Sequence, residues 1–145
     1  EVNLTDVCNF YMGTLALHRD HISNREVIAN TIIIERDSKL PVSVTKRLYT
    51  VYEGQERLEC SVTQSEGPEE NKEFVNIIHQ EDLKLPKGRP AKQPIDITYS
   101  YDESGKMHCR FTDVESGNSH EIELTPETTQ ALDKYRKQVE EISIE

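Results

Sequence analysis

Apolar and polar residues alternate with a period of two along much of the chain, most clearly in its last third. The run IDITYSY occupies residues 95–101, and a second alternating run, MHCRFT, occupies residues 107–112. A third run, EIEL, follows at residues 121–124, and the turn-forming segments DESG and ESGN separate the three. Alternation of this kind is typical of a strand with one buried face. The three runs therefore predict an antiparallel meander.

The first half of the chain also favours strands, although its alternation is less regular. Val, Ile, Tyr, Thr and Leu, which suit a pleated surface, are concentrated in residues 11–18, 27–36, 42–52, 57–64 and 73–78. Between these runs lie Pro41, an acidic stretch at 66–70 and a segment at 84–94 with several prolines, none of which suits a strand interior. Because no helical pattern interrupts the series, parallel crossovers are not expected. The pattern predicts a mainly β fold, an antiparallel two-sheet β-sandwich of about eight strands.

The pattern changes at Thr125, which marks the start of a predicted C-terminal α-helix. Thr125 is a suitable N-cap, Pro126 fits the first helical position, and Glu127 suits the positive end of the helix dipole. One apolar stripe then recurs at spacings of three and four residues, formed by Leu132, Tyr135, Val139 and Ile142. We therefore divide the chain into a β-sandwich at residues 1–124 and a helix at residues 125–145, whose stripe needs a covering surface and could mediate self-association.

Composition narrows the classes of partner. With 145 residues the chain is one domain in size, and a content of 34% hydrophobic residues predicts a thin core. The formal net charge of −10 leaves no basic surface for phosphates, so nucleic acid is not an expected partner. No apolar run approaches the roughly 20 residues of a membrane span. Three widely spaced cysteines (Cys8, Cys60 and Cys109) argue against a disulfide framework and favour a reducing compartment, so we expect a cytoplasmic protein.

No local motif for catalysis, metal binding or nucleotide binding is found. His18 and His21 lack the helical spacing of a pair of metal ligands. Cys109 follows His108 on a predicted strand, where neighbouring side chains point to opposite faces, so the two cannot form a thiol–imidazole pair. The six glycines lie too far apart for a phosphate-binding loop. We predict no catalytic residue, no metal site and no cofactor in this chain, which is not expected to be an enzyme.

Several segments resemble, in order, the substrate-binding domain of the seventy-kilodalton heat-shock chaperones, the DnaK family. Asp6-Val7 with Met12-Gly13 resembles the family's first strand, and Ile33-Ile34-Glu35-Arg36 with Leu40-Pro41 resembles its next strand and turn. Gln64-Ser65-Glu66 resembles a later strand end. The most specific likeness is the ungapped meander at residues 95–124. The residues VNLTDVC and IIER are more similar to the divergent bacterial paralogues than to the main housekeeping member.

The resemblance implies a chaperone module that binds short, extended apolar segments of unfolded proteins in a channel at one end of the sandwich. Leu17 and Val51 match two side chains that arch over the peptide, and Leu58 matches the central pocket. Ala16 and Tyr49 match positions whose main-chain atoms bond to the peptide, and Gln55 matches a polar group at its backbone. The implied peptide-binding residues are Thr14, Ala16, Leu17, Leu48, Tyr49, Val51, Gln55, Leu58 and Cys60.

The chain also departs from the family's pattern. Thr14 stands where an aliphatic residue is usual and Leu48 where a phenylalanine is usual, which leaves the preference of the pocket open. The resemblance further implies a parent chain in which an ATP-hydrolysing domain with Mg²⁺ precedes this module, a helical lid begins near Thr125, and co-chaperones assist. An alternative is a sandwich that docks one folded partner or co-chaperone and whose cleft has degenerated.

Overall fold

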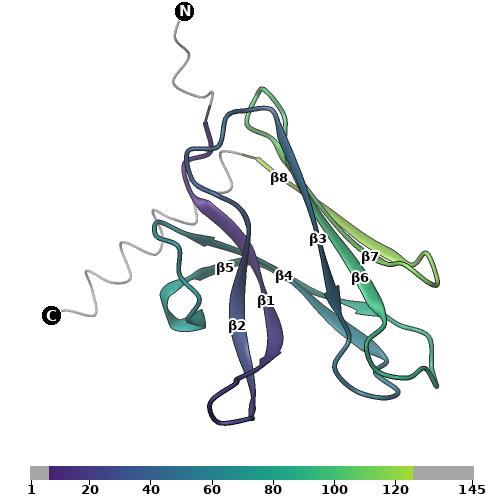
Figure 1. Ribbon diagram of the computed structural model, residues 1–145. Coiled ribbons are helices and arrows are strands. Elements are labelled where there is room, and N and C mark those ends of the chain that lie inside the picture. The colour runs from purple at the N-terminus through teal and green to yellow at the C-terminus, as the bar shows by residue number, and fades with distance from the viewer. Residues whose placement is uncertain (1–6, 126–145) are drawn as a thin grey trace, which may run out of the picture.

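A computed structural model describes residues 7–125, which form two four-stranded antiparallel sheets packed face to face (Figure 1). The first sheet has the order β2-β1-β4-β5 and the second the order β3-β6-β7-β8. Each strand is short and is bounded by turn or loop residues. The strands are β1 (Tyr11–Arg19), β2 (Glu26–Ile34), β3 (Val42–Tyr49), β4 (Arg57–Ser65), β5 (Asn76–Lys84), β6 (Pro94–Tyr101), β7 (Met107–Asp113) and β8 (Ser119–Leu124).

The second sheet is a regular ladder. β6 pairs along its whole length with β3 on one side and β7 on the other, and no register shift interrupts either pairing. Its alternating residues place Ile95, Ile97 and Tyr99 in the core, opposite Phe111 and Cys109 of β7. The predicted meander at residues 95–124 is confirmed, because strict alternation gave each strand one apolar face to bury.

The first sheet is irregular. Its register shifts between Met12 and Gly13 of β1 and again between Val62 and Thr63 of β4. Gly13 is needed at the first shift, since a Cβ atom there would lie 2.4 Å from the carbonyl oxygen of Thr31. Bulges of this kind bend a strand and turn it away from its neighbour.

The core lies between the two sheets and is closed differently along its two open sides. On the side of the edge strands β2 and β3, Lys46 Nζ donates to the carbonyl oxygen of Ile32 at 2.6 Å. On the other side, the edge strands β5 and β8 approach one another through His79 and His120. The fully buried apolar side chains between the layers include Met12, Ile34, Cys60, Val62, Ile95, Tyr99, Met107, Cys109 and Phe111.

The predicted β-sandwich of about eight strands is confirmed, with two corrections to its boundaries. The strand expected at residues 42–52 ends at Tyr49, and a loop follows it. The strand expected at 73–78 instead begins at Asn76 and runs to Lys84, after a 3₁₀ turn at Lys72–Phe74. The predicted helix at residues 125–145, with its apolar stripe, lies outside the described residues except for Thr125, where no helix is assigned.

Candidate functional site

The first sheet contains a fork between its two central strands. β1 and β4 pair only at Tyr11 with Ser65, Met12 with Gln64 and Gly13 with Thr63. Beyond Gly13, β1 stays paired with β2 while β4 stays paired with β5. The two strands therefore separate toward the end of the sandwich that carries the loops 20–25, 50–56 and 85–93.

The buried hydroxyl of Tyr99 closes the base of this fork. Its oxygen lies 2.7 Å from the carbonyl oxygen of Gly13 and 3.1 Å from that of Ser61, so one O–H is shared between both strands. Ser61 Oγ in turn accepts the amide N–H of Leu15 at 2.9 Å. Burial raises the pKa of Tyr99 well above its ordinary value, which keeps the hydroxyl protonated as a donor. The second sheet thus supplies the group that satisfies the backbone where the first sheet opens.

A pocket of about 560 Å³ opens at the fork. Its walls come from β1, β3, β4 and the loop 50–56, and buried side chains of the second sheet, Ile95, Ile97 and Phe111, form its floor. Eight of the nine residues implied by the resemblance line it, namely Thr14, Ala16, Leu17, Leu48, Tyr49, Val51, Gln55 and Leu58. The ninth, Cys60, does not. Its side chain is fully buried in the core, where burial raises the pKa of the thiol to about 12.

Main-chain groups face the pocket from β1 and β3. In a strand, the polar groups of alternate residues point to the same edge. Gly13 and Leu15 direct theirs toward β4, so by alternation Leu17 does the same and Ala16 directs its groups toward β2. Main-chain bonding to a peptide at Ala16, which the resemblance implies, stays a prediction.

The main-chain groups of Tyr49 point away from β6. Thr50 exchanges backbone hydrogen bonds with Gln93 and Lys92 on the β6 side of β3. Tyr49, one residue earlier, therefore directs its N–H and C=O to the outer edge of β3. Its partner in the register is Pro94, which has no N–H to donate.

Gln55 organises the loop 50–56 from within. Its Oε1 accepts the amide N–H groups of Val51 at 3.0 Å and Tyr52 at 3.4 Å, and its Nε2 donates to the carbonyl oxygen of Arg57 at 2.9 Å. The side chain lines the pocket, but most of its hydrogen-bonding capacity is used by its own loop. Its clearest structural role is to hold Val51 in place.

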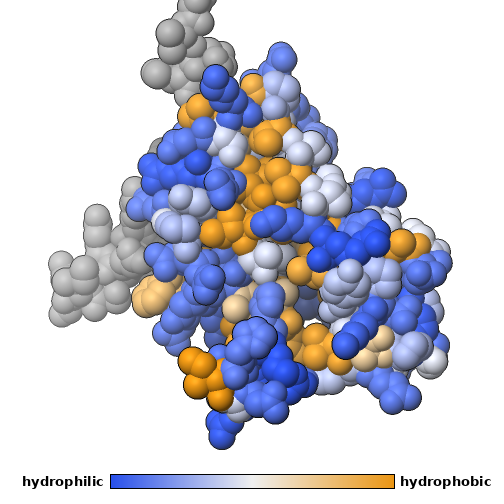
Figure 2. Space-filling view, viewed as in Figure 1, coloured by the Kyte–Doolittle hydropathy of each residue, from blue (hydrophilic) through white to orange (hydrophobic). Residues whose placement is uncertain are grey.

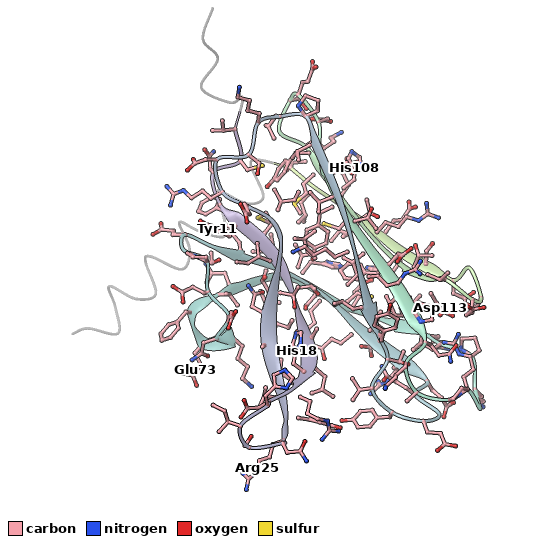
Figure 3. All side chains as sticks on the ribbon, in the orientation of Figure 1. Tyr11, His18, Arg25, Glu73, His108 and Asp113 are labelled. Carbon is pink, nitrogen blue, oxygen red and sulfur yellow. The ribbon has the colours of Figure 1, made fainter. Side chains whose placement is uncertain are left out.

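The loop 50–56 is tied to the second sheet through a buried ion pair. Gly54 N–H donates to the carbonyl oxygen of Arg89 at 2.7 Å. The Arg89 guanidinium contacts both carboxylate oxygens of Asp113, at 3.0 and 3.1 Å, and Asp113 is fully buried. Ser116 also donates to this carboxylate. Asp113 lies where β7 ends beside the loops (Figure 3), so a fixed charge in the second sheet anchors one wall of the pocket.

The three arginines that line the pocket are each paired with a carboxylate. Arg19 lies 3.5 Å from Glu26, Arg47 2.8 Å from Asp96 and Arg57 3.1 Å from Asp82. A hydrogen bond to Glu26 raises the pKa of Tyr52 and joins the loop 50–56 to the start of β2. Because these three cations are neutralised, the apolar walls contribute most to what the pocket accepts.

Exposed apolar side chains gather at the same end of the molecule. Figure 2 shows apolar surface among polar groups at the lower end, where Figure 3 places His18 and Arg25, and more of it up the middle of this face. The exposed large apolar residues here are Ile22, Val27, Ile28, Tyr49 and Tyr52. Such a cluster beside a pocket is typical of a surface that binds another chain.

No protein-family model matches the chain. It is 30% identical over 97 residues to the chaperone protein DnaK of Mycoplasmoides gallisepticum, a match that covers 66% of this chain and 16% of that protein. It is 27% identical over 109 residues to the chaperone protein DnaK of Thermotoga maritima, covering 75% of this chain and 18% of that protein.

The chain is similar to DnaK chaperones. These matches support a region like the substrate-binding part of the seventy-kilodalton heat-shock proteins, and the sandwich fold agrees with that similarity. The chain spans about a sixth of the length of the DnaK proteins that it matches. Within residues 7–125, no helix is long and apolar enough to cross a membrane.

Several residues that build the site were not singled out from sequence. Tyr99 was assigned to a strand but not to the fork, and Arg89 and Asp113 lie 24 positions apart without a shared motif. Ile28, which lines the pocket while remaining 49% exposed, lay within a predicted strand. Of these residues, only Tyr99 could have been found from sequence. The alternation of its strand places its polar hydroxyl on an otherwise apolar face.

Proposed function

We propose that this chain is a peptide-binding module of a chaperone, which holds an extended apolar segment of an unfolded polypeptide at the fork between β1 and β4. The observation that carries the proposal is one apolar pocket bordered by outward-directed main-chain groups of Leu17 and Tyr49. An extended peptide needs both features, because its backbone requires hydrogen-bond partners and its side chains require apolar cavities. The similarity to DnaK chaperones supports the same assignment.

The expected affinity is modest. Burying one leucine-sized side chain contributes about 1.5–3 kcal/mol, and each hydrogen bond to the peptide backbone about 1 kcal/mol net. Ordering the peptide offsets part of this gain, which leaves binding on the order of micromolar. Such a site tolerates many sequences, provided that one apolar side chain reaches the pocket near Leu58.

The proposal extends to the whole protein and its setting. We infer that ATP hydrolysis with Mg²⁺, a lid and co-chaperone contacts belong to other parts of the parent protein, and that this module itself performs no reaction. Three free, buried cysteines in the described region agree with a reducing cytoplasmic setting.

The test is titration of a labelled leucine-rich peptide, followed by fluorescence polarisation, with a polar peptide of equal length as reference. Ile28→Glu and Ile77→Glu form a matched pair, because these isoleucines are 49% and 46% exposed on opposite edge strands of the same sheet. We expect Ile28→Glu, in the pocket wall, to weaken binding at least about tenfold, and Ile77→Glu to change it less than about twofold.

A second variant addresses the pocket directly. Leu58→Phe adds volume to the pocket lining and is expected to reduce affinity for the leucine-rich peptide without unfolding the sandwich. Equal binding by wild type, Ile28→Glu and Leu58→Phe would exclude this pocket as the binding site. Failure to bind any short apolar peptide, together with tight binding to one folded protein, would favour the docking module instead.

A further inference from the structure

A cluster of two histidines and one glutamate lies away from the pocket, on the open side of the sandwich between β5 and β8. In the register, His79 stands opposite Val62 and His120 opposite Phe111, and both of these partners belong to the buried core. Residues opposite one another in a ladder point to the same face of the sheet. Both imidazoles therefore point into the space between the layers.

The two imidazole rings are held close together. They stack with centroids 5.3 Å apart and an interplanar angle of 7°, and their Nε2 atoms are 3.0 Å apart. Phe111 lies against one side of the pair, with its ring centroid 6.5 Å from that of His120. The two Nε2 atoms thus face one another at the margin of the core.

A carboxylate completes the cluster. Glu81 follows His79 by two residues on β5, so both side chains lie on the same face of that strand. Its Oε2 lies 3.4 Å from His120 Nε2, and one donor atom from each of the three residues lies within 4.8 Å of the others. His120 is 18% exposed and Glu81 60% exposed, so the cluster is open to solvent on the Glu81 side.

These donors select a class of ion. Two imidazole nitrogens and one carboxylate oxygen suit Zn²⁺, whereas Ca²⁺ and Mg²⁺ require mainly oxygen ligands. Two Zn–N bonds of about 2.0–2.1 Å at a tetrahedral angle would place the nitrogens about 3.3 Å apart. The two Nε2 atoms are 3.0 Å apart, slightly closer than that value, and Glu81 Oε2 lies 3.4 Å from His120 Nε2.

The surroundings of His79 agree with this use. Burial lowers the pKa of His79; Glu81 opposes the shift and His120 adds to it. A lowered pKa favours the neutral imidazole, which is the form that binds a metal ion. A simple N–H···N hydrogen bond would also explain the contact between the histidines, but it would not require the carboxylate beside them.

We propose that His79, Glu81 and His120 form a Zn²⁺ site that joins β5 to β8 across the open side of the sandwich. The three side chains supply three ligands, and water from the exposed side supplies the fourth. An ion held by both edge strands ties the two sheets together at the side opposite the Lys46 contact. Zn²⁺ therefore stabilises the folded chain by an amount that depends on its concentration.

The test is Zn²⁺ titration of the 145-residue chain in competition with a chromophoric chelator. We expect one equivalent to bind and to raise the thermal unfolding midpoint. His79→Gln and His120→Gln should each raise the dissociation constant at least about tenfold. His108→Gln is the matched control, because His108 Nδ1 lies 3.6 Å from a carboxylate oxygen of Glu123 without a second histidine.

A further variant separates ligand loss from damage to the fold. Glu81 is exposed, so Glu81→Gln should leave the circular dichroism spectrum unchanged and still weaken Zn²⁺ binding. Binding that survives in Glu81→Gln and both histidine variants, or that falls equally in His108→Gln, would overturn the proposal and indicate adventitious binding at surface histidines. If the wild-type chain does not bind Zn²⁺, the proposal is wrong and the contact between His79 and His120 is a hydrogen bond.

Discussion

The two sheets of this sandwich have the same number of strands but different regularity. The second sheet keeps an unbroken register from β3 through β8, whereas the first has two register shifts and a pairing between β1 and β4 that ends at Gly13. The pocket lies where the ladder ends, and its floor consists of side chains from the regular sheet. One sheet is therefore a rigid support, and the irregularity of the other produces the site.

The support acts through three contacts, of which the first two are buried and the third lies at the surface. Asp113 holds Arg89 and the loops, Tyr99 holds the base of the fork, and Asp96 holds Arg47 on the surface of the second sheet. If the second sheet supports the site, removing these contacts should lower the free energy of unfolding in that order. None of Asp113, Tyr99 and Asp96 lies in the first sheet.

The largest effect is expected for Arg89→Met. Removing the guanidinium leaves the fully buried Asp113 carboxylate without a cation, which costs about 3–5 kcal/mol of unfolding free energy. The measurement is urea unfolding. Affinity for the peptide should also fall, because the carbonyl oxygen of Arg89 accepts the hydrogen bond from Gly54 and so helps to position the loop 50–56.

The double variant Arg89→Met/Asp113→Leu is the control for charge. Arg89 Nε and Nη2 are buried without a hydrogen-bond partner among the described residues, so the native pair is itself incompletely satisfied. Replacing both partners by apolar side chains should recover most of the lost stability. A double variant as unstable as the single one would show that shape, and not charge, holds the loop.

An intermediate effect is expected for Tyr99→Phe. The substitution leaves the carbonyl oxygens of Gly13 and Ser61 without their shared buried donor, at a cost of about 1–3 kcal/mol in urea unfolding. Tyr101→Phe on the same strand is the control, because its hydroxyl has no hydrogen bond to a described residue, and we expect a change within about 0.5 kcal/mol. Equal effects of the two substitutions would show that the hydrogen bonds of Tyr99 at the fork do not account for the loss of stability.

The smallest effect is expected for Asp96→Asn, and it should depend on pH. The hydrogen bond from Arg47 lowers the pKa of Asp96 below its ordinary 3.8. The pair therefore stabilises the fold above pH 3.8, and this contribution is lost as the pH falls through the lower folded-state pKa. Exposed pairs contribute little, so the difference from wild type should be small near neutral pH and vanish in acid. A difference that persists in acid would point to packing.

The regular sheet was the more predictable one from sequence. The three strands within residues 95–124 alternate because one face of each strand packs on the core. A period of two is visible in the sequence without tertiary information. β5 was placed too early because its second half, with Gln80, Glu81 and Asp82, is polar. An edge strand tolerates such residues, and no local pattern distinguishes it from a loop.

The candidate site was less predictable, because it depends on tertiary geometry. The resemblance named eight residues that line one pocket, but the direction of main-chain groups depends on the register of β1, which placed Leu17 and not Ala16 toward the fork. Contact between Gln55 and a peptide stays a prediction, and sequence gave no sign that its amide also serves its own loop. His79 and His120 lie 41 residues apart, and only the pairing of distant strands brings them together.

The early end of the β1–β4 ladder also bears on aggregation. Unpaired strand edges are normally a hazard, because they recruit further strands from other molecules. Here the free edge of β1 lies inside the sheet, with β2 on one side and β4 on the other. Under the proposed function, a single extended chain would enter this recess, whereas the edge of another folded sheet would be too broad for it. An edge placed in this way would be available to unfolded chains and shielded from folded copies of the same molecule.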